Sequence, residues 1–124
     1  MIGYTVHRID AVTNASTVSK TIRLNAGIKR VLGVLAVMPD AYSASAQSQA
    51  MDTRIGLKYN GVEVLPRDFS LGLLLHTGYL PMRDAMLQTP FETVEGTENG
   101  ISIDVEISGD GNVPSVDLYF ATES

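Results

Sequence analysis

The sequence predicts an all-β protein in which two antiparallel sheets pack face to face as a β-sandwich. First, several segments alternate apolar and polar residues one by one, which is the period of a half-buried strand. Second, Asn-Gly and Gly-Asp-Gly-Asn clusters separate these segments, as tight turns do. Third, the 124 residues are 44% hydrophobic and contain no cysteine. A chain of this size buries a core without disulfides, so we expect one domain over residues 1–124.

The most specific local pattern is a β-hairpin over residues 55–64. Apolar residues alternate with polar ones from Ile55 to Tyr59 and again from Val62 to Val64, on either side of Asn60-Gly61. Asn-Gly favours the two positive φ angles of a type I′ turn, which matches the twist of a two-strand hairpin. We therefore expect Lys58 and Glu63 to face each other across it.

A second hairpin is predicted near the end of the chain. Residues 101–108 alternate strictly between isoleucine or valine and polar residues, Gly109 to Asn112 forms a turn region, and a strand follows from Pro114 to Phe120.

The first part of the chain contributes three more predicted strands. Residues 18–24 alternate, residues 31–38 form a short apolar run typical of a strand covered on both sides, and residues 2–9 give a weaker pattern. A further short apolar strand is predicted over Leu71 to His76.

Three stretches lack a strand pattern. Residues 41–52 contain small polar side chains without a clear period and are interpreted as a loop or one short helix. Residues 79–88 are interpreted as a loop or a short helix, in which Pro81 would lie in the first turn. Phe91 to Gly100, with three glutamates, is interpreted as an acidic connection.

Seven or eight strands with two tight hairpins and several long connections fit a β-sandwich of jelly-roll or immunoglobulin-like topology. The long connections at 41–52 and 77–100 favour the jelly roll. The cysteine-tryptophan-cysteine core of antibody domains is missing.

Charge and hydropathy exclude some classes of partner. The net charge is -5, which argues against nucleic-acid binding, because that affinity comes mainly from neutralising phosphates. Residues 1–60 are net basic and residues 61–124 net acidic, which suits either head-to-tail contact between copies or, our preferred interpretation, strands that mix the charges. The longest apolar run, 31–38, is far shorter than the ~20 residues that span a bilayer. With no signal-peptide pattern at the first residues, we expect a soluble protein without a membrane partner.

No catalytic, cofactor-binding or metal residue is predicted. The two histidines, His7 and His76, have no sequence neighbours that suggest a catalytic or metal partner, and we interpret both as structural. Glu92, Glu95 and Glu98 would align only on a helix, which the nearby glycines disfavour, so a solvated loop is expected.

Other motifs are equally weak. The cluster from Gly109 to Asn112, with Asp117, offers oxygen ligands but lacks the twelve-residue calcium loop. Asn14-Ala15-Ser16 matches the glycosylation triplet, which occurs often by chance. The glycines form neither a phosphate-binding loop nor a nucleophile elbow, so we expect a protein that is not an enzyme and needs no cofactor.

The chain resembles the small jelly-roll structural proteins of virus and bacteriophage particles, such as capsid, penton, decoration and fibre-associated proteins. The residues that carry the resemblance are Met1-Ile2-Gly3 and the alternating strands 18–24, 55–64, 101–107 and Val116 to Phe120. The resemblance implies a virion component that forms homo-oligomers or binds other virion proteins. Tyr119 and the Ser/Ala segment 43–50 are the expected contacts.

Two alternatives remain open. One is a carbohydrate- or ligand-binding β-sandwich, although the chain has only three Phe, five Tyr and no Trp for an aromatic platform. The other is a hydrolase or isomerase, which would need His7 or His76 to meet a carboxylate.

Overall fold

The computed structural model describes residues 2–10, 17–37, 51–75, 86–92, 100–109 and 115–124. These ranges contain eight strands and one 3-10 helix. The strands are β1 (Ile2–Ile9), β2 (Val18–Arg23), β3 (Arg30–Val37), β4 (Thr53–Tyr59), β5 (Val62–Ser70), β6 (Leu87–Glu92), β7 (Ser102–Gly109) and β8 (Val116–Glu123), and the helix is η1 (Leu71–Leu74).

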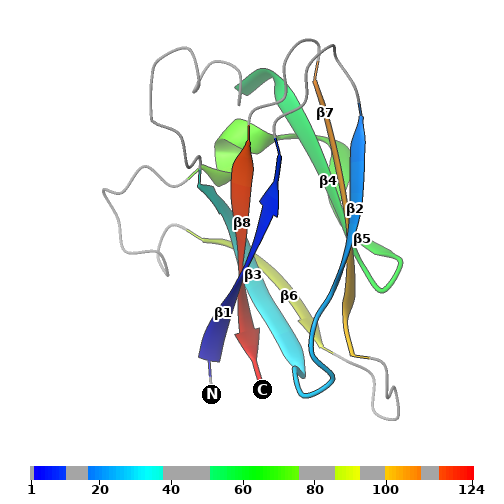
Figure 1. The fold of residues 1–124 in the computed structure, drawn as a ribbon, viewed down its shortest axis with the longest axis vertical. Coiled ribbons are helices and arrows are strands. Elements are labelled where there is room, and N and C mark those ends of the chain that lie inside the picture. The colour runs from blue at the N-terminus through cyan, green and yellow to red at the C-terminus, as the bar shows by residue number, and fades with distance from the viewer. Residues whose placement is uncertain (1, 11–16, 38–50, 76–85, 93–99, 110–114) are drawn as a thin grey trace.

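The strands form two four-stranded sheets that pack face to face (Figure 1). One has the order β1-β8-β3-β6 and is called the β1 sheet below; the other has the order β2-β7-β4-β5 and is called the β2 sheet. All neighbouring strands are antiparallel. The predicted all-β antiparallel sandwich is therefore confirmed.

The pairing follows a nested order that settles the topology. The first strand pairs with the eighth, the second with the seventh, the third with the sixth and the fourth with the fifth. This is the arrangement of a jelly roll, which was favoured over the immunoglobulin-like alternative.

The core lies between the sheets and follows from the alternation of the strands. Leu57 and Tyr59 of β4, Ile103 of β7, and Leu118 and Phe120 of β8 are fully buried. Strand β3 is buried on both faces, as predicted for its apolar run, since Val34, Leu35 and Ala36 in succession have no exposed surface.

The hairpin predicted over residues 55–64 is confirmed. Asn60 and Gly61 have φ angles of 49° and 82°, as a type I′ turn requires, and Lys58 lies opposite Glu63. Strand β5 runs on to Ser70, past Pro66, because it is an edge strand on which a proline is tolerated.

The predicted strand from Leu71 to His76 is wrong. Leu71 to Leu74 forms the 3-10 helix η1, in which Leu71 and Leu74 are both buried and Leu73 is 66% exposed. A 3-10 helix has three residues per turn, so this spacing places both buried leucines on one side. His76 lies outside the described residues.

The interpretation of 79–88 as a loop or helix is wrong at residues 87–88, and that of 91–100 as a connection is wrong at residues 91–92, because these residues belong to a strand. Strand β6 crosses their boundary from Leu87 to Glu92, at the edge of the β1 sheet, where Pro90 is tolerated. Thr89 and Phe91 of this strand contact Tyr59 of the opposite sheet, and this packing fixes the strand. Residues 79–85 and 93–99 lie outside the described residues, as do 41–50 and 110–114.

Candidate functional site

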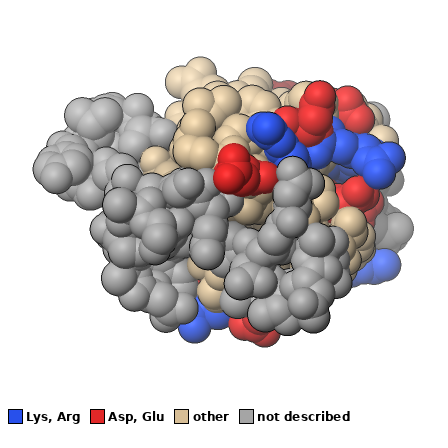
Figure 2. Space-filling model, turned by 90° about the horizontal axis from the view of Figure 1, so that it is seen from above, with Lys and Arg blue, Asp and Glu red and all other residues tan. Residues whose placement is uncertain are grey.

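The outer face of the β2 sheet is charged. Charged side chains of β4, β5 and β7 line a groove of about 180 Å³ on this face; they are Lys58, Glu63, Arg67, Asp104 and Glu106. In Figure 2 the basic and acidic side chains lie together toward the right, the side that the β2 sheet occupies in Figure 1.

The charges on this face are interspersed and paired. Arg67 forms an ion pair with Glu106 at 3.3 Å, and the Thr21 hydroxyl donates a hydrogen bond to Asp104 at 2.9 Å. Gly56 leaves room for β5 to cross the face, since a Cβ at this position would lie 3.1 Å from the Cα of Arg67.

Ion pairs elsewhere join the basic first half of the chain to its acidic second half. Arg8 pairs with Asp117 at 2.9 Å, and Arg30 pairs with Glu92 at 2.9 Å and with Glu123 at 3.6 Å. The expected mixing of charges between strands is therefore confirmed.

The middle of the outer face of the β1 sheet is apolar, between the Arg8–Asp117 ion pair at one end and the ion pairs of Arg30 at the other. Three large side chains of β1 point outward and are about half exposed: Ile2 at 61%, Tyr4 at 47% and Val6 at 49%. A groove of about 360 Å³ continues from this stripe across the sheet; it is lined by Ile2, Tyr4, Leu32, Met86, Gln88, Pro90 and Ala121. These residues, with Val6, are called the apolar face below.

The strand register extends the apolar face into rows. Tyr4 lies opposite Ala121, which lies opposite Gly33. Val6 lies opposite Tyr119, which lies opposite the fully buried Leu35. The middle of the β1 sheet is thus apolar on both faces, whereas the outer face of the β2 sheet is charged.

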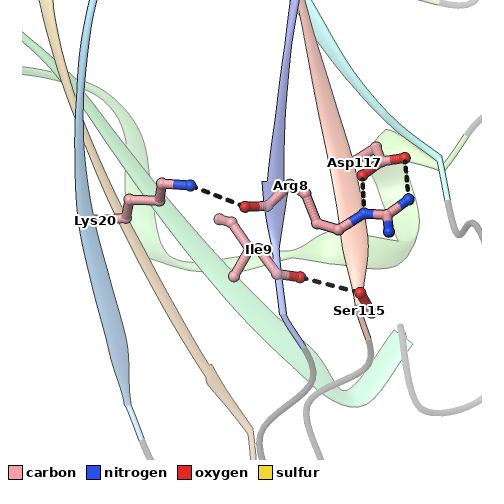
Figure 3. Close-up of polar contacts among 5 residues, drawn as sticks. All are labelled: Arg8, Ile9, Lys20, Ser115 and Asp117. Atoms are coloured by element: carbon pink, nitrogen blue, oxygen red, sulfur yellow. Dashed lines mark hydrogen bonds and ion pairs between the residues drawn. The ribbon is translucent and has the colours of Figure 1, made fainter.

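The β1 strand is also an edge strand, free of any further strand pairing among the described residues, and hydrogen bonds show which of its backbone groups point toward that edge. The Ile9 carbonyl accepts a hydrogen bond from the Ser115 hydroxyl, beside β8, at 3.3 Å. The Arg8 carbonyl points the other way and accepts one from Lys20 of β2 at 2.9 Å (Figure 3). Because backbone groups alternate in direction along a strand, those of Ile2, Tyr4 and Val6 also point away from β8.

The Arg8 side chain anchors the end of this strand to β8. Its guanidinium donates two hydrogen bonds to the Asp117 carboxylate, at 2.9 and 3.3 Å (Figure 3). This fork geometry suits an Arg–carboxylate pair and fixes the β1–β8 register.

Of the histidines and acidic residues considered from the sequence, His7, Glu92 and Asp117 are described, and they lie on three different strands. His7 faces inward with its ring centroid 6.4 Å from that of Phe120; burial first, and then the charge of Lys20, lower the pKa of His7 below 6.5. Glu92 and Asp117 lie in ion pairs on different strands, while Glu95, Glu98 and the Gly-Asp-Gly-Asn turn beyond Gly109 lie outside the described residues.

Two further findings concern the described ranges alone. They hold no cluster of three or more His, Cys, Asp or Glu side chains placed to bind a metal ion. Nor does any helix within them have the length and apolar character needed to cross a membrane.

Sequence reasoning missed most of the apolar face. Tyr119 does lie on the outer face of β8, partly buried, but the segment 43–50 and Asn14 lie outside the described residues. The signal was present in residues 2–6, where the larger side chains Ile2, Tyr4 and Val6 alternate with Gly3 and Thr5. Such a pattern would ordinarily place the larger set in the core, whereas pairing with β8 turns it outward.

Comparisons with known proteins show a weak likeness to solved structures. No protein-family model and no curated protein matches the chain. Among solved structures, it is similar to the crystal structure of the infectious bursal disease virus VP2 subviral particle, with 13% identity and a TM-score of 0.33. The match covers 96% of this chain and 32% of that chain. A similarity of this degree supports no conclusion about function.

Proposed function

We propose that the protein is a non-enzymatic structural protein that assembles with copies of itself or with other proteins, as a component of a virus or bacteriophage particle. The observation that carries the proposal is the apolar outer face of the β1 sheet. Exposed apolar side chains that adjoin an apolar groove, as Ile2, Tyr4 and Val6 do here, support a protein–protein contact at this face.

The free energy gained by covering the exposed side chains determines how large a stable contact must be. Fully burying a side chain such as isoleucine contributes about 1.5–3 kcal/mol, so covering the half-exposed Ile2, Tyr4 and Val6 supplies roughly 2–5 kcal/mol. Association costs an estimated 4–15 kcal/mol in lost translational and rotational freedom. A stable contact therefore has to extend beyond the β1 stripe and cover the groove as well.

The jelly-roll topology is compatible with this role and does not determine it. Capsid proteins, lectin domains and cupins all use jelly rolls, and function depends on the sites that each fold presents. Of the two outer sheet faces, the more apolar one is that of the β1 sheet, and it does not form an aromatic platform for a sugar. This favours assembly over sugar binding. The fold class, which viral capsid proteins also use, and the apolar face support the virion proposal.

Sedimentation velocity over a range of protein concentrations tests assembly. The wild type should form oligomers, and Leu32→Glu, which places a charge in the apolar groove, should lower its association at least tenfold. Val62→Lys is the matched control, because Val62 is an exposed apolar side chain of the β2 sheet at 55% exposure. A wild-type protein that remains monomeric at every concentration would contradict the proposal.

Electron microscopy of the concentrated protein tests the virion assignment. A capsid or decoration role predicts closed shells, rings or regular arrays. Irregular aggregates, or oligomers that bury the apolar face in a single closed dimer, would argue for an assembly protein of another kind.

A second candidate is a module that binds a polar ligand or a carbohydrate in the charged groove. Its support is the 180 Å³ groove, where the Asp104 and Glu106 carboxylates and the Lys58 ammonium supply acceptors and donors. Saturable binding on a glycan panel that Asp104→Asn weakens, by a protein that stays monomeric, would favour this function.

A further inference from the structure

We propose that a second copy of this chain pairs with the free edge of β1 in antiparallel orientation, so that two β1 sheets join into one eight-stranded sheet. The inference rests on the proposed assembly function and adds a second contact to it, through the edge of the sheet, beside the contact that covers the apolar groove. The two copies are related by a two-fold axis that passes beside Tyr4.

The backbone of β1 is suited to such pairing. Its eight residues pair with β8 in an unbroken register and include no proline. The N–H and C=O groups of Ile2, Tyr4 and Val6 point to the free edge, where they have no partner among the described residues. An exposed, regular edge strand with apolar side chains is a template for another strand.

The other three sheet edges are protected. Strand β6 contains Pro90, and its pairing with β3 is interrupted by a register shift. Strand β5 contains Pro66 and has two register shifts against β4. Strand β2 is regular but short, and carries Lys20 and Arg23. Prolines, irregularities and charges of this kind discourage edge pairing, so β1 is the edge left open.

Lys20 fixes the register of the second copy. Its ammonium donates a hydrogen bond to the Arg8 carbonyl, which is therefore not available to a second copy. The backbone N–H and C=O groups that remain available at the open edge belong to residues 2, 4 and 6. A two-fold axis beside Tyr4 pairs Tyr4 with Tyr4, and Ile2 with Val6, of the two copies. Each of these three pairs exchanges two backbone hydrogen bonds. A register centred on Thr5 would instead pair Ile2 with Arg8 and require the Lys20 contact to break.

The side chains agree with the same register. On the outer face it sets Ile2 beside Val6 and the two Tyr4 rings beside each other, while Arg8 lies beyond the paired segment. No like charges face each other, and aromatic and β-branched side chains are favourable partners across strands. The paired stripe is continuous with the apolar groove, which Ile2 and Tyr4 also line.

Disulfide trapping with single-cysteine variants tests the register directly, because the chain has no cysteine of its own. Directly opposed residues of a hydrogen-bonded pair have Cα atoms about 5.5 Å apart, within the range that a disulfide spans. Tyr4→Cys should therefore form a disulfide-linked dimer under mild oxidation. Val6→Cys, on the same strand and face, should not, since its two copies would lie about 13 Å apart.

The outcomes separate this inference from the assembly proposal. A Tyr4→Cys dimer without a Val6→Cys dimer supports the register, with Val62→Cys on the other sheet as the control for random collision. Cross-linking of Val6→Cys in preference to Tyr4→Cys overturns it. If the wild type forms oligomers and Tyr4→Cys, folded by circular dichroism, does not cross-link, edge pairing is wrong and assembly through the apolar face stands. A strictly monomeric wild type overturns both.

Discussion

A hydrogen bond between Tyr59 and Thr89 connects the two sheets through the core, and breaking it should reveal how much the sheets depend on it. The Tyr59 hydroxyl, on β4, lies 2.6 Å from the Thr89 hydroxyl, on β6. Tyr59 is fully buried and Thr89 is 6% exposed. The perturbation is a double-mutant cycle made of Tyr59→Phe, Thr89→Val and the two together.

The expected magnitudes follow from what each change leaves behind. Either single variant leaves a buried hydroxyl without its partner, which costs about 1–3 kcal/mol of unfolding free energy. The double variant removes both hydroxyls, and replacing both partners by apolar groups of the same shape is nearly neutral. The coupling energy is the double variant's cost minus both single costs, so the cycle should give a magnitude of about 2–6 kcal/mol.

Urea denaturation measures the cycle, and alkaline pH gives an independent check. Burial raises the pKa of Tyr59 to about 12, although its hydrogen bond to Thr89 opposes the shift. The unfolded tyrosine ionises near pH 10, so Tyr59 contributes stability below pH 10 that is lost as pH rises toward 12. Tyr59→Phe should remove that part of the loss. Additive single costs, or a Tyr59→Phe cost below about 0.5 kcal/mol, would refute the argument.

Four further predictions concern single positions. The pKa of His7 is lowered from 6.5, so the stability that neutral His7 contributes is complete above pH 6.5 and is lost as pH falls toward the folded pKa. The urea midpoint of His7→Asn should therefore fall less than that of the wild type between pH 7.5 and pH 5. Gly33→Ala should destabilise the protein by about 1–3 kcal/mol, because its Cβ would lie 2.7 Å from a carbonyl oxygen of β6; Gly27→Ala, in open space, is the control. Thr5→Val should raise the melting temperature, with a gain of about 1 kcal/mol, since the Thr5 hydroxyl is buried without a partner among the described residues. Asn60→Ala should cost about 1–3 kcal/mol by calorimetry, because Asn60 has a φ of 49° and its side chain accepts a hydrogen bond from a backbone N–H of β7 at 2.7 Å. Asn60→Gly should cost less than Asn60→Ala, and equal costs would contradict the role of the backbone angle.

The regular strands could be predicted because their alternation is a local property. The strands at 18–23, 53–59 and 102–109 present one apolar and one polar face, and Asn60-Gly61 specifies its turn without help from the rest of the chain. Strand β6 could not be found in this way, because Gln88 and Pro90 interrupt the pattern. Its fixing contacts, from Thr89 and Phe91 to Tyr59, come from a strand about thirty residues earlier.

The apolar face could not be predicted from the sequence for a related reason. Alternation divides a strand into two faces but does not say which of them turns to the core. The inward-facing residues of β1 are Gly3, Thr5, His7 and Ile9, and only Ile9 is both apolar and buried. The strand lies at a sheet edge, where the inner face is less completely covered. The register with β8 and the Arg8–Asp117 pair decide the orientation, and both depend on residues at the far end of the chain.

The nested strand order has a consequence for the protein during its synthesis. Arg8 and Asp117 are 109 residues apart, so β1 emerges from the ribosome long before the strand that pairs with it. At about 5–20 residues per second, a nascent chain would carry β1 without its partner for roughly 5–20 s. Pairing over such separations also makes folding slow. Both edges of β1, with Ile2, Tyr4 and Val6, are unpaired throughout this interval, so β1 is an extended segment that a molecular chaperone could bind.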